Sequence, residues 1–329
     1  MQIEEIKKKW IALPKKRKRL YASASIFFFF SFLYIFFHAA PRDFPVGQVV
    51  TINIGESLQT ITTALHEAHV IRSPFVFRTT VILLGGEKKV IAGDYMLDKR
   101  EGSYDIAHRL VKGKFHLEAV KVTVLEGWNI YDIANYLQKN LLKFNKDQFL
   151  ALAKNKEGHL FPDTYFVSPT IKPEALIKMM EDNFDNKVDA LKNEILSSGH
   201  SREQIITMAS ILEEEAGTTE SRKIVSGILW RRISIGMPLQ VDSTFSYING
   251  KGTHELSLVD LKIDSPYNTY KYKGLPAGPI SNPGLNAIEA AIYPTKTKYV
   301  YFLSSRNGTM HYAVTFDEHK KNKELYLNK

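Results

Sequence analysis

The sequence of 329 residues contains no cysteine, and this absence excludes several kinds of site. A disulfide framework, a thiolate zinc finger, an iron–sulfur cluster and a cysteine nucleophile all require thiols. The Gly-x-Ser-x-Gly elbow of serine hydrolases and the phosphate-binding Gly-x-x-x-x-Gly-Lys loop are missing as well. Any metal would have to bind through histidine and carboxylate side chains. Since none of these motifs is present, we expect no cofactor.

One short pattern resembles a metal site. His66-Glu67-Ala68-His69 has two histidines and a glutamate, but it is one residue short of the spacing that zinc proteases use on a helix. It also lies far in sequence from the residues that carry chemistry below. We therefore predict no metal there.

Charged residues are absent from Leu20–Ala40, a segment of about 20 residues that is long enough to cross the hydrocarbon layer of a membrane. Residues 1–19 carry eight basic and two acidic side chains, and so hold six of the nine surplus positive charges. A nucleic-acid-binding protein would carry its basic patch on the folded part, so we expect no nucleic-acid partner. By the positive-inside rule, the basic tail stays in the cytoplasm and the chain from Pro41 onward faces outward.

A cleaved signal peptide is the competing interpretation of the same segment. Signal peptides have a shorter apolar run, about 7–15 residues, followed by a small-x-small cleavage site. Near Ala39 and Ala40 the upstream position is occupied by Phe37 or His38. We predict a retained single-pass anchor in the bacterial cytoplasmic (inner) membrane.

Two outer segments repeat one pattern 72 positions apart. Each begins with Val-Thr, continues with a glycine, and then carries apolar residues at helical spacing, which predicts a strand, a glycine turn and a short amphipathic helix. Further elements are expected between the two copies, so the region is a small α+β arrangement that serves either as a scaffold or as a ligand-binding domain. The repeats are Val50-Thr51 with Gly55, Leu58, Ile61 and Leu65, and Val122-Thr123 with Gly127, Ile130, Ile133 and Leu137; the intervening elements are a helix over Pro74–Leu84, a strand from Gly93 and a helix over Tyr104–Val111.

From about Asn155 the composition shifts to helices joined by aromatic-rich loops. The stretch from His159 to Tyr165 is interrupted by proline and predicts irregular structure. Asn307-Gly308 between two apolar runs predicts a hairpin. The expected elements are helices over Pro173–Glu194, Arg202–Glu215, Ser221–Ile235 and Leu285–Ile292, and strands over Tyr299–Leu303 and His311–Thr315.

Three consecutive glutamates end one of these helices. A capping-box pattern from Ser201 to Gln204 fixes the helix start, and its apolar face can then be assigned at about 100° per residue. Glu215 lies about 60° from the centre of that face, Glu213 about 100° away on the other side, and Glu214 nearly opposite. A carboxyl half-sunk among apolar side chains has a raised pKa, which suits a general acid. A solvated glutamate run is the alternative.

The loops that follow are rich in Tyr, Asn, Gln and Pro. Aromatic faces can stack on sugar rings and amides can pair with hydroxyls, so this composition favours a carbohydrate ligand.

These motifs together resemble one family, the endolytic murein transglycosylases of the YceG-like family. The resemblance covers nearly the whole chain, because the basic tail, single anchor, small LysM-like domain and catalytic domain follow in the same order. The second acidic residue of the family's Glu-x-Glu falls on Glu215, and the intervening position, often Lys in relatives, is Glu214 here. The matching stretches are Phe161–Tyr165, Met208–Glu215, Arg231–Ile233 with Gly236–Thr244, and Tyr267–Tyr270 with Gly274–Pro276.

The resemblance implies cleavage of the β-1,4 bond between N-acetylmuramic acid and N-acetylglucosamine within nascent peptidoglycan strands. Glu215 would protonate the leaving oxygen and then, as carboxylate, accept the proton of the muramyl C6 hydroxyl, which closes a 1,6-anhydro ring and ends strand elongation. The expected partners are glycan strands, the membrane and peptidoglycan synthases. The residues expected to orient substrate or stabilise charge are Glu213, Gln240, Asp242, Asn268 and Tyr270.

We therefore predict an α+β protein with a cytoplasmic tail (1–19), a transmembrane helix (20–40), a LysM-like α+β domain (41–154) and a mixed helical and β catalytic domain (155–329). Two alternatives remain open. A muramidase-type hydrolase would use Asp242 or Asp163 as a second carboxylate. A non-catalytic peptidoglycan-binding scaffold would not depend on Glu215.

Overall fold

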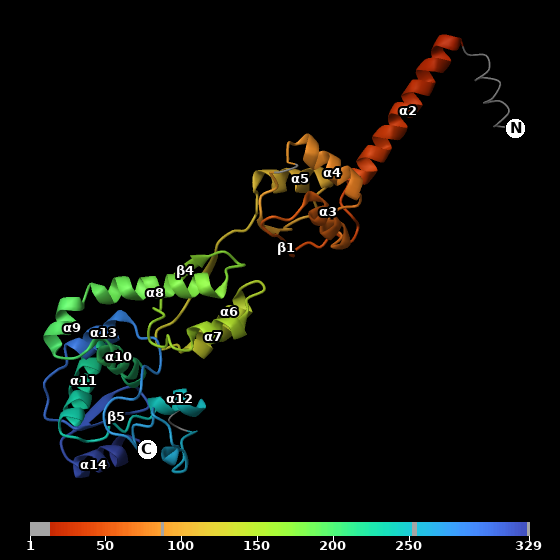
Figure 1. The fold of residues 1–329 in the computed structure, drawn as a ribbon. Helices are drawn as coiled ribbons and strands as arrows, with labels where there is room; N and C mark the ends of the chain where they lie inside the picture. Colours follow the sequence, from red (N-terminus) through yellow and green to blue (C-terminus); the bar gives the residue numbers. More distant parts are fainter. Residues whose placement is uncertain (1–13, 87–88, 252–254, 328–329) are drawn as a thin grey trace. The chain divides into compact units, whose positions relative to one another are not determined.

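The computed structural model describes residues 14–86, 89–251 and 255–327, and the chain divides into two compact units, one ending at Glu118 and the other beginning at Ala119 (Figure 1). Each unit has hydrophobic clusters of its own. Both contain helices together with short antiparallel strand pairs. This mixture confirms the predicted α+β class.

Helix α2 (Lys15–His38) is long and apolar enough to cross a membrane, and none of its residues is buried. It begins before the predicted span, because the basic residues from Lys15 continue the same helix. It ends at His38 rather than Ala40. Ala40 precedes Pro41, and a residue in that position disfavours helical backbone.

After α2, the described residues of the first unit form two strands, with two helices between them and one after them. The strands pair antiparallel, with Val50 opposite Tyr95, and Gly55 makes the turn before the first helix at a φ of 84°. Leu65, Phe77 and Leu110 are buried at the centre of the unit. The elements are β1 (Val49–Ile52), α3 (Leu58–Glu67), α4 (Pro74–Leu83), β2 (Gly93–Met96) and α5 (Ser103–Lys112).

The second unit begins with the other copy of the repeat. Its strands again pair antiparallel around two helices, with Val122 opposite Tyr165, and Gly127 makes the turn at a φ of 82°. Both copies therefore form a strand, a glycine turn and a helix, as the sequence predicts. The elements are β3 (Val120–Thr123), α6 (Ile130–Asn140), α7 (Lys146–Ala153) and β4 (Thr164–Val167).

The predicted domain boundary after residue 154 lies inside this second unit. β3 and β4 pair across it, and Leu137 and Tyr165 share one buried cluster. The strand pair forms because β4 contributes a β-branched and aromatic run, Thr164–Val167, which begins two residues after Pro162. Residues 119–154 consequently pack with the segment that follows them.

The remaining chain is mostly helical. The predicted helix Pro173–Glu194 is two helices, because the backbone breaks near Leu191. The predicted helix Arg202–Glu215 and the predicted hairpin at Asn307-Gly308 are confirmed, with Leu303 opposite His311. The elements are α8 (Pro173–Asp189), α9 (Lys192–Ser198), α10 (Arg202–Glu215), α11 (Thr219–Ser234), α12 (Ser243–Asn249), the 3-10 helix η2 (Asp260–Lys262), α13 (Leu285–Ile292), β5 (Tyr301–Ser304), β6 (Met310–Ala313) and α14 (Phe316–Tyr326).

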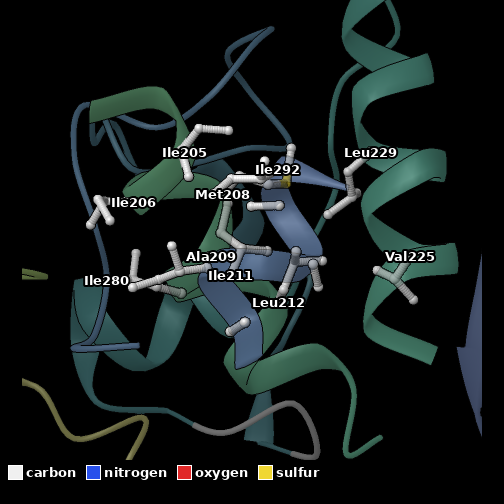
Figure 2. Close-up of a cluster of buried hydrophobic side chains, with 14 of the residues drawn as sticks. Ile205, Ile206, Met208, Ala209, Ile211, Leu212, Val225, Leu229, Ile280 and Ile292 are labelled. Atoms are coloured by element: carbon white, nitrogen blue, oxygen red, sulfur yellow. The ribbon is translucent and has the colours of Figure 1, made fainter. Parts of the chain in front are cut away.

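Helix α10 contributes to the largest hydrophobic cluster, where it packs against both α11 and α13 (Figure 2). Every residue from Ile205 to Leu212 is buried, including Thr207 and Ser210. Burial of each large aliphatic side chain contributes about 1.5–3 kcal/mol. The Ser210 hydroxyl accepts the Ile280 N–H at 3.1 Å, which satisfies a buried polar group. This burial fixes the helix, and so fixes the position of the residues at its C-terminal end.

Candidate active site

The register of α10 is set at both ends. Ser201 and Gln204 form the predicted capping box, in which each side chain accepts the backbone N–H of the other residue. The helix ends at Glu215, because Ala216 takes extended backbone and Gly217 follows. The last helical residue is thus a glutamate whose backbone is held by a rigid, buried helix.

The three glutamates at this end have different surroundings. Both oxygens of Glu213 are used, since they accept from the Arg222 guanidinium and, at 2.9 Å, from the Gly284 N–H at the start of α13. Glu214 is exposed as a residue, but its carboxyl lies against the Gly127 turn, and its burial there together with the neighbouring carboxylates raises its pKa to about 7. Glu213 therefore links helices, in addition to any contact with substrate.

Glu215 is half-buried and sits beside the start of α12. Burial, followed by the nearby Asp242 carboxylate, raises the pKa of Glu215, while the Ser243 hydroxyl and backbone N–H and the Arg232 guanidinium oppose that rise. Its Oε1 accepts the Ser243 N–H at 3.4 Å. The raised pKa predicted from the helical pattern is confirmed. A carboxyl whose pKa is raised keeps its proton to a higher pH than a free glutamate does, and it can still exist as a carboxylate after giving that proton away.

Asp242 and Tyr270 form a pair next to Glu215. The Tyr270 hydroxyl donates to Asp242 Oδ1 at 2.5 Å, and the Tyr270 ring lies 6.0 Å from the Phe245 ring. Burial raises the pKa of Tyr270, as does its bond to Asp242, so the phenol keeps its proton. Two of the predicted site residues are thus brought to Glu215.

Gln240 and Asn268 hold the loops around this pair. Gln240 has a φ of 49°, and its N–H donates to the Thr269 carbonyl at 3.1 Å, while its side chain is exposed. Asn268 is buried, with its amide donating to the Leu261 and Ile263 carbonyls and its oxygen accepting the Tyr270 N–H. The Asn268 side chain is therefore committed to the shape of the loop and acts by positioning Tyr270.

Ser243 and Arg232 also belong to the site, although neither was among the predicted site residues. The Ser243 hydroxyl is buried and has no further partner among the described residues. The Arg232 guanidinium is buried, donates to the Leu239 and Val300 carbonyls, and has its charge near Glu215. A helical projection of α11 would have identified Arg232, because it continues the buried positions Val225 and Leu229 at helical spacing.

A second buried carboxyl lies elsewhere in the same unit. Glu157 is 6% exposed, and its oxygens accept the Ile130 N–H at 3.2 Å and the Asn282 amide at 3.0 Å. Burial raises the pKa of Glu157 to about 8. This group is protonated in the folded protein at neutral pH.

We expect Glu157 to make the free energy of unfolding fall as the pH rises from about 4.5 to about 8, by on the order of 4 kcal/mol. Between these values the unfolded chain has lost the proton while the folded chain retains it, so each rise in pH favours unfolding. Urea unfolding of wild type and Glu157→Gln at several pH values measures the effect. The variant should show a flatter pH profile, and equal slopes in both proteins would contradict the expectation.

His66, Glu67 and His69 of the short histidine pattern line one pocket, and the Nδ1 atom of each histidine has a partner within the protein. His69 Nδ1 pairs with Asp43 at 2.7 Å, whereas His66 Nδ1 contacts the Ile71 carbonyl at 3.2 Å. Among the described residues, the Asp98, Glu101 and His116 side chains do approach one another within 4.8 Å. Arg109 is ion-paired with Glu101 in that cluster, so the buried carboxylate already has a cationic partner.

Comparison with known proteins points to one family. Residues 50–325 match the YceG-like family. A Bacillus subtilis (strain 168) protein named endolytic murein transglycosylase is 35% identical over 308 residues, which are 85% of this chain and 85% of that protein. A protein of the same name from Streptococcus pneumoniae (strain D39) is 28% identical over 91% of this chain, which spans 62% of its length. The crystal structure of a yceG-like protein from Listeria monocytogenes, 30% identical, matches 83% of this chain and 98% of that one with a TM-score of 0.58.

Proposed function

The chain belongs to the YceG-like family, and we propose that it is an endolytic murein transglycosylase that cuts peptidoglycan glycan strands at the bond between N-acetylmuramic acid and N-acetylglucosamine. The observation that carries this proposal is the half-buried Glu215 carboxyl, whose pKa is raised by burial at the end of a rigid helix. It can therefore act first as an acid and then as a base. The relatives' name supports the same class of reaction.

The proposed reaction needs no water. Protonated Glu215 gives its proton to the glycosidic oxygen as the bond from that oxygen to the muramyl C1 breaks. The muramyl C6 hydroxyl then attacks C1, and the Glu215 carboxylate accepts its proton, so the 1,6-anhydro ring closes and the residue returns to its starting state. One carboxyl performs both transfers, whereas hydrolysis usually requires two carboxyls at a defined separation.

Asp242 and Tyr270 are proposed to act on the charge that develops at the reacting sugar. An oxocarbenium-like transition state is positive, and the Asp242 carboxylate beside Glu215 has the opposite sign. The bond from Tyr270 holds that carboxylate in one orientation. Gln240, with its exposed side chain, is proposed to contact substrate hydroxyls. Glu213 and Asn268 are proposed to contribute by fixing α13 and the Tyr270 loop.

We further propose that α2 anchors the protein in the bacterial cytoplasmic membrane, with the basic tail in the cytoplasm and the chain from Pro41 onward outside. The βααβ arrangement of the first unit is proposed to be LysM-like and to bind glycan strands, and the catalytic part is proposed to extend to the end of the chain. Cleavage close to the membrane would favour newly made strands, which peptidoglycan synthases supply.

The test is mass spectrometry of uncrosslinked glycan strands after incubation with the protein in water labelled with heavy oxygen. The proposal expects 1,6-anhydromuramyl ends, which are lighter than reducing ends by one water molecule and contain no heavy oxygen. Reducing ends carrying heavy oxygen would indicate a hydrolase instead. That alternative remains because Asp242 lies near Glu215 and could serve as the second carboxylate. Strand binding without any new ends, from a folded protein, would indicate a non-catalytic scaffold.

A further inference from the structure

Helix α4 in the first unit has apolar residues on two opposite faces, and its own core explains only one of them. Phe77 and Val81 are fully buried, whereas Phe75, Ile82 and Leu83 are 80%, 42% and 82% exposed. At about 100° per residue, the three exposed residues fall within about 100° of each other, nearly opposite Phe77. A surface helix of a soluble domain ordinarily presents polar residues to water. Among the described residues, therefore, no apolar surface covers the outer face of α4.

The position of α4 beside α2 places this apolar face close to the proposed membrane anchor. The two helices are in contact. Arg72, which lies just before α4, donates to the Phe36 carbonyl at 3.4 Å and to the Ala40 carbonyl at 2.9 Å, and its guanidinium lies 5.0 Å from the centre of the Phe36 ring. Phe36 and Ala40 stand at the outer end of the apolar segment. α4 consequently starts at the level where α2 leaves the hydrocarbon layer.

Arginine side chains cluster at the same level. Arg100 donates to the Pro41 carbonyl at 2.6 Å, directly after the end of α2. Arg78 is exposed on α4, beside the outer apolar face, and Arg42 is exposed next to Pro41. Arginines extend along apolar surfaces and place their charge among lipid phosphates. The charges around α4 thus complement the headgroup layer, as its apolar face complements the acyl chains.

We propose that α4 lies in the outer interface of the same bilayer, with Phe75, Ile82 and Leu83 inserted among the lipid acyl chains. With 10 residues, α4 is about 15 Å long, too short to cross the hydrocarbon layer. Such helices instead lie along the membrane, with their apolar face about 5–10 Å deep. The proposal rests on the proposed anchoring by α2 and extends it, because a second contact fixes the tilt of the first unit on the membrane.

The absence of cysteine makes a direct test simple, since each single-cysteine variant carries one label. The full chain is reconstituted in phospholipid vesicles with an environment-sensitive fluorophore at Phe75→Cys or Leu83→Cys. Phe29→Cys, within α2, reports on the anchor. Ile54→Cys is the matched control, because Ile54 is an apolar residue of the same unit that is 94% exposed and lies outside α4. Quenchers are attached to the lipid acyl chains, either near the headgroup or at the chain end.

The headgroup-side quencher should reduce fluorescence about twofold or more at positions 75 and 83 and leave position 54 unchanged, while position 29 responds to the chain-end quencher. If position 29 is quenched but 75 and 83 behave like 54, the anchor stands and the inference is wrong. If position 29 is not quenched, the anchoring and the inference both fail. Labels at 75 and 83 that are shielded from water but not quenched by lipid would mean that protein covers α4, which also overturns the inference.

Discussion

Replacing Glu215 by glutamine is expected to reduce the rate of strand cleavage by about 10³-fold or more, because in the proposed reaction this one carboxyl performs both proton transfers. Glutamine keeps the size and can still accept the Ser243 N–H, but it can neither donate a proton to the leaving oxygen nor accept one from the C6 hydroxyl. Counting new anhydromuramyl ends over time with wild type and variant measures the loss. Thermal unfolding of the variant should stay close to that of wild type, since removal of a half-buried charge does not leave a cavity.

The adjacent residue provides a matched control. Glu214→Gln changes the same functional group one position along the helix, and Glu214 is exposed. We expect its rate to remain within about threefold of wild type, with the alkaline limb of the pH–rate profile displaced to lower pH. That displacement follows because a neighbouring negative charge is removed, and the Glu215 proton is then lost more easily. Equal losses in the two variants would mean that Glu215 has no special role.

Replacing Asn282 by alanine is expected to lower the free energy of unfolding by roughly 3–5 kcal/mol. The side chain is fully buried, and its amide donates to the Trp128 carbonyl and Glu157 while its oxygen accepts the Leu160 N–H at 2.9 Å. Alanine leaves these groups buried without partners. It also separates the β3–α6 turn from the segment that leads into α13.

Urea unfolding of the full chain followed by tryptophan fluorescence measures this loss, because Trp128 lies at the affected contact. Asn140→Ala is the control, since the Asn140 amide makes one exposed bond within its own helix, to the Tyr136 carbonyl. That variant should differ from wild type by about 0.5 kcal/mol or less. A similar destabilisation in both variants would argue against the linking role of Asn282.

The elements that could be predicted from sequence are those with strong local signals. The capping box and the apolar run placed α10 at its observed bounds, and Asn307-Gly308 placed the last hairpin. β4 was missed because Pro162 made its surroundings look irregular, and its pairing with β3 is non-local. The break near Leu191 was missed because residues on both sides of it favour helix.

The candidate site was predictable in part for the same reason. The helical pattern identified Glu215, but it treated Glu213 as less buried than it is, because burial of Glu213 depends on Arg222 from the next helix. Asp242 and Tyr270 were proposed from loop composition and family resemblance, and their direct bond joins residues 28 positions apart in sequence. Asn268 could not be distinguished from a ligand-binding amide until its partners in the loop were known.

The burial of α10 on every side has a consequence for how the protein is made. Its apolar residues are covered by α11 and, more extensively, by α13, which is synthesised only after α12 and the loop that carries Tyr270. Until Ile292 has emerged, the stretch from Ile205 to Leu212 has no complete shelter and is prone to aggregation. Glu215 ends the same helix, so its position is fixed only once α13 has packed against α10.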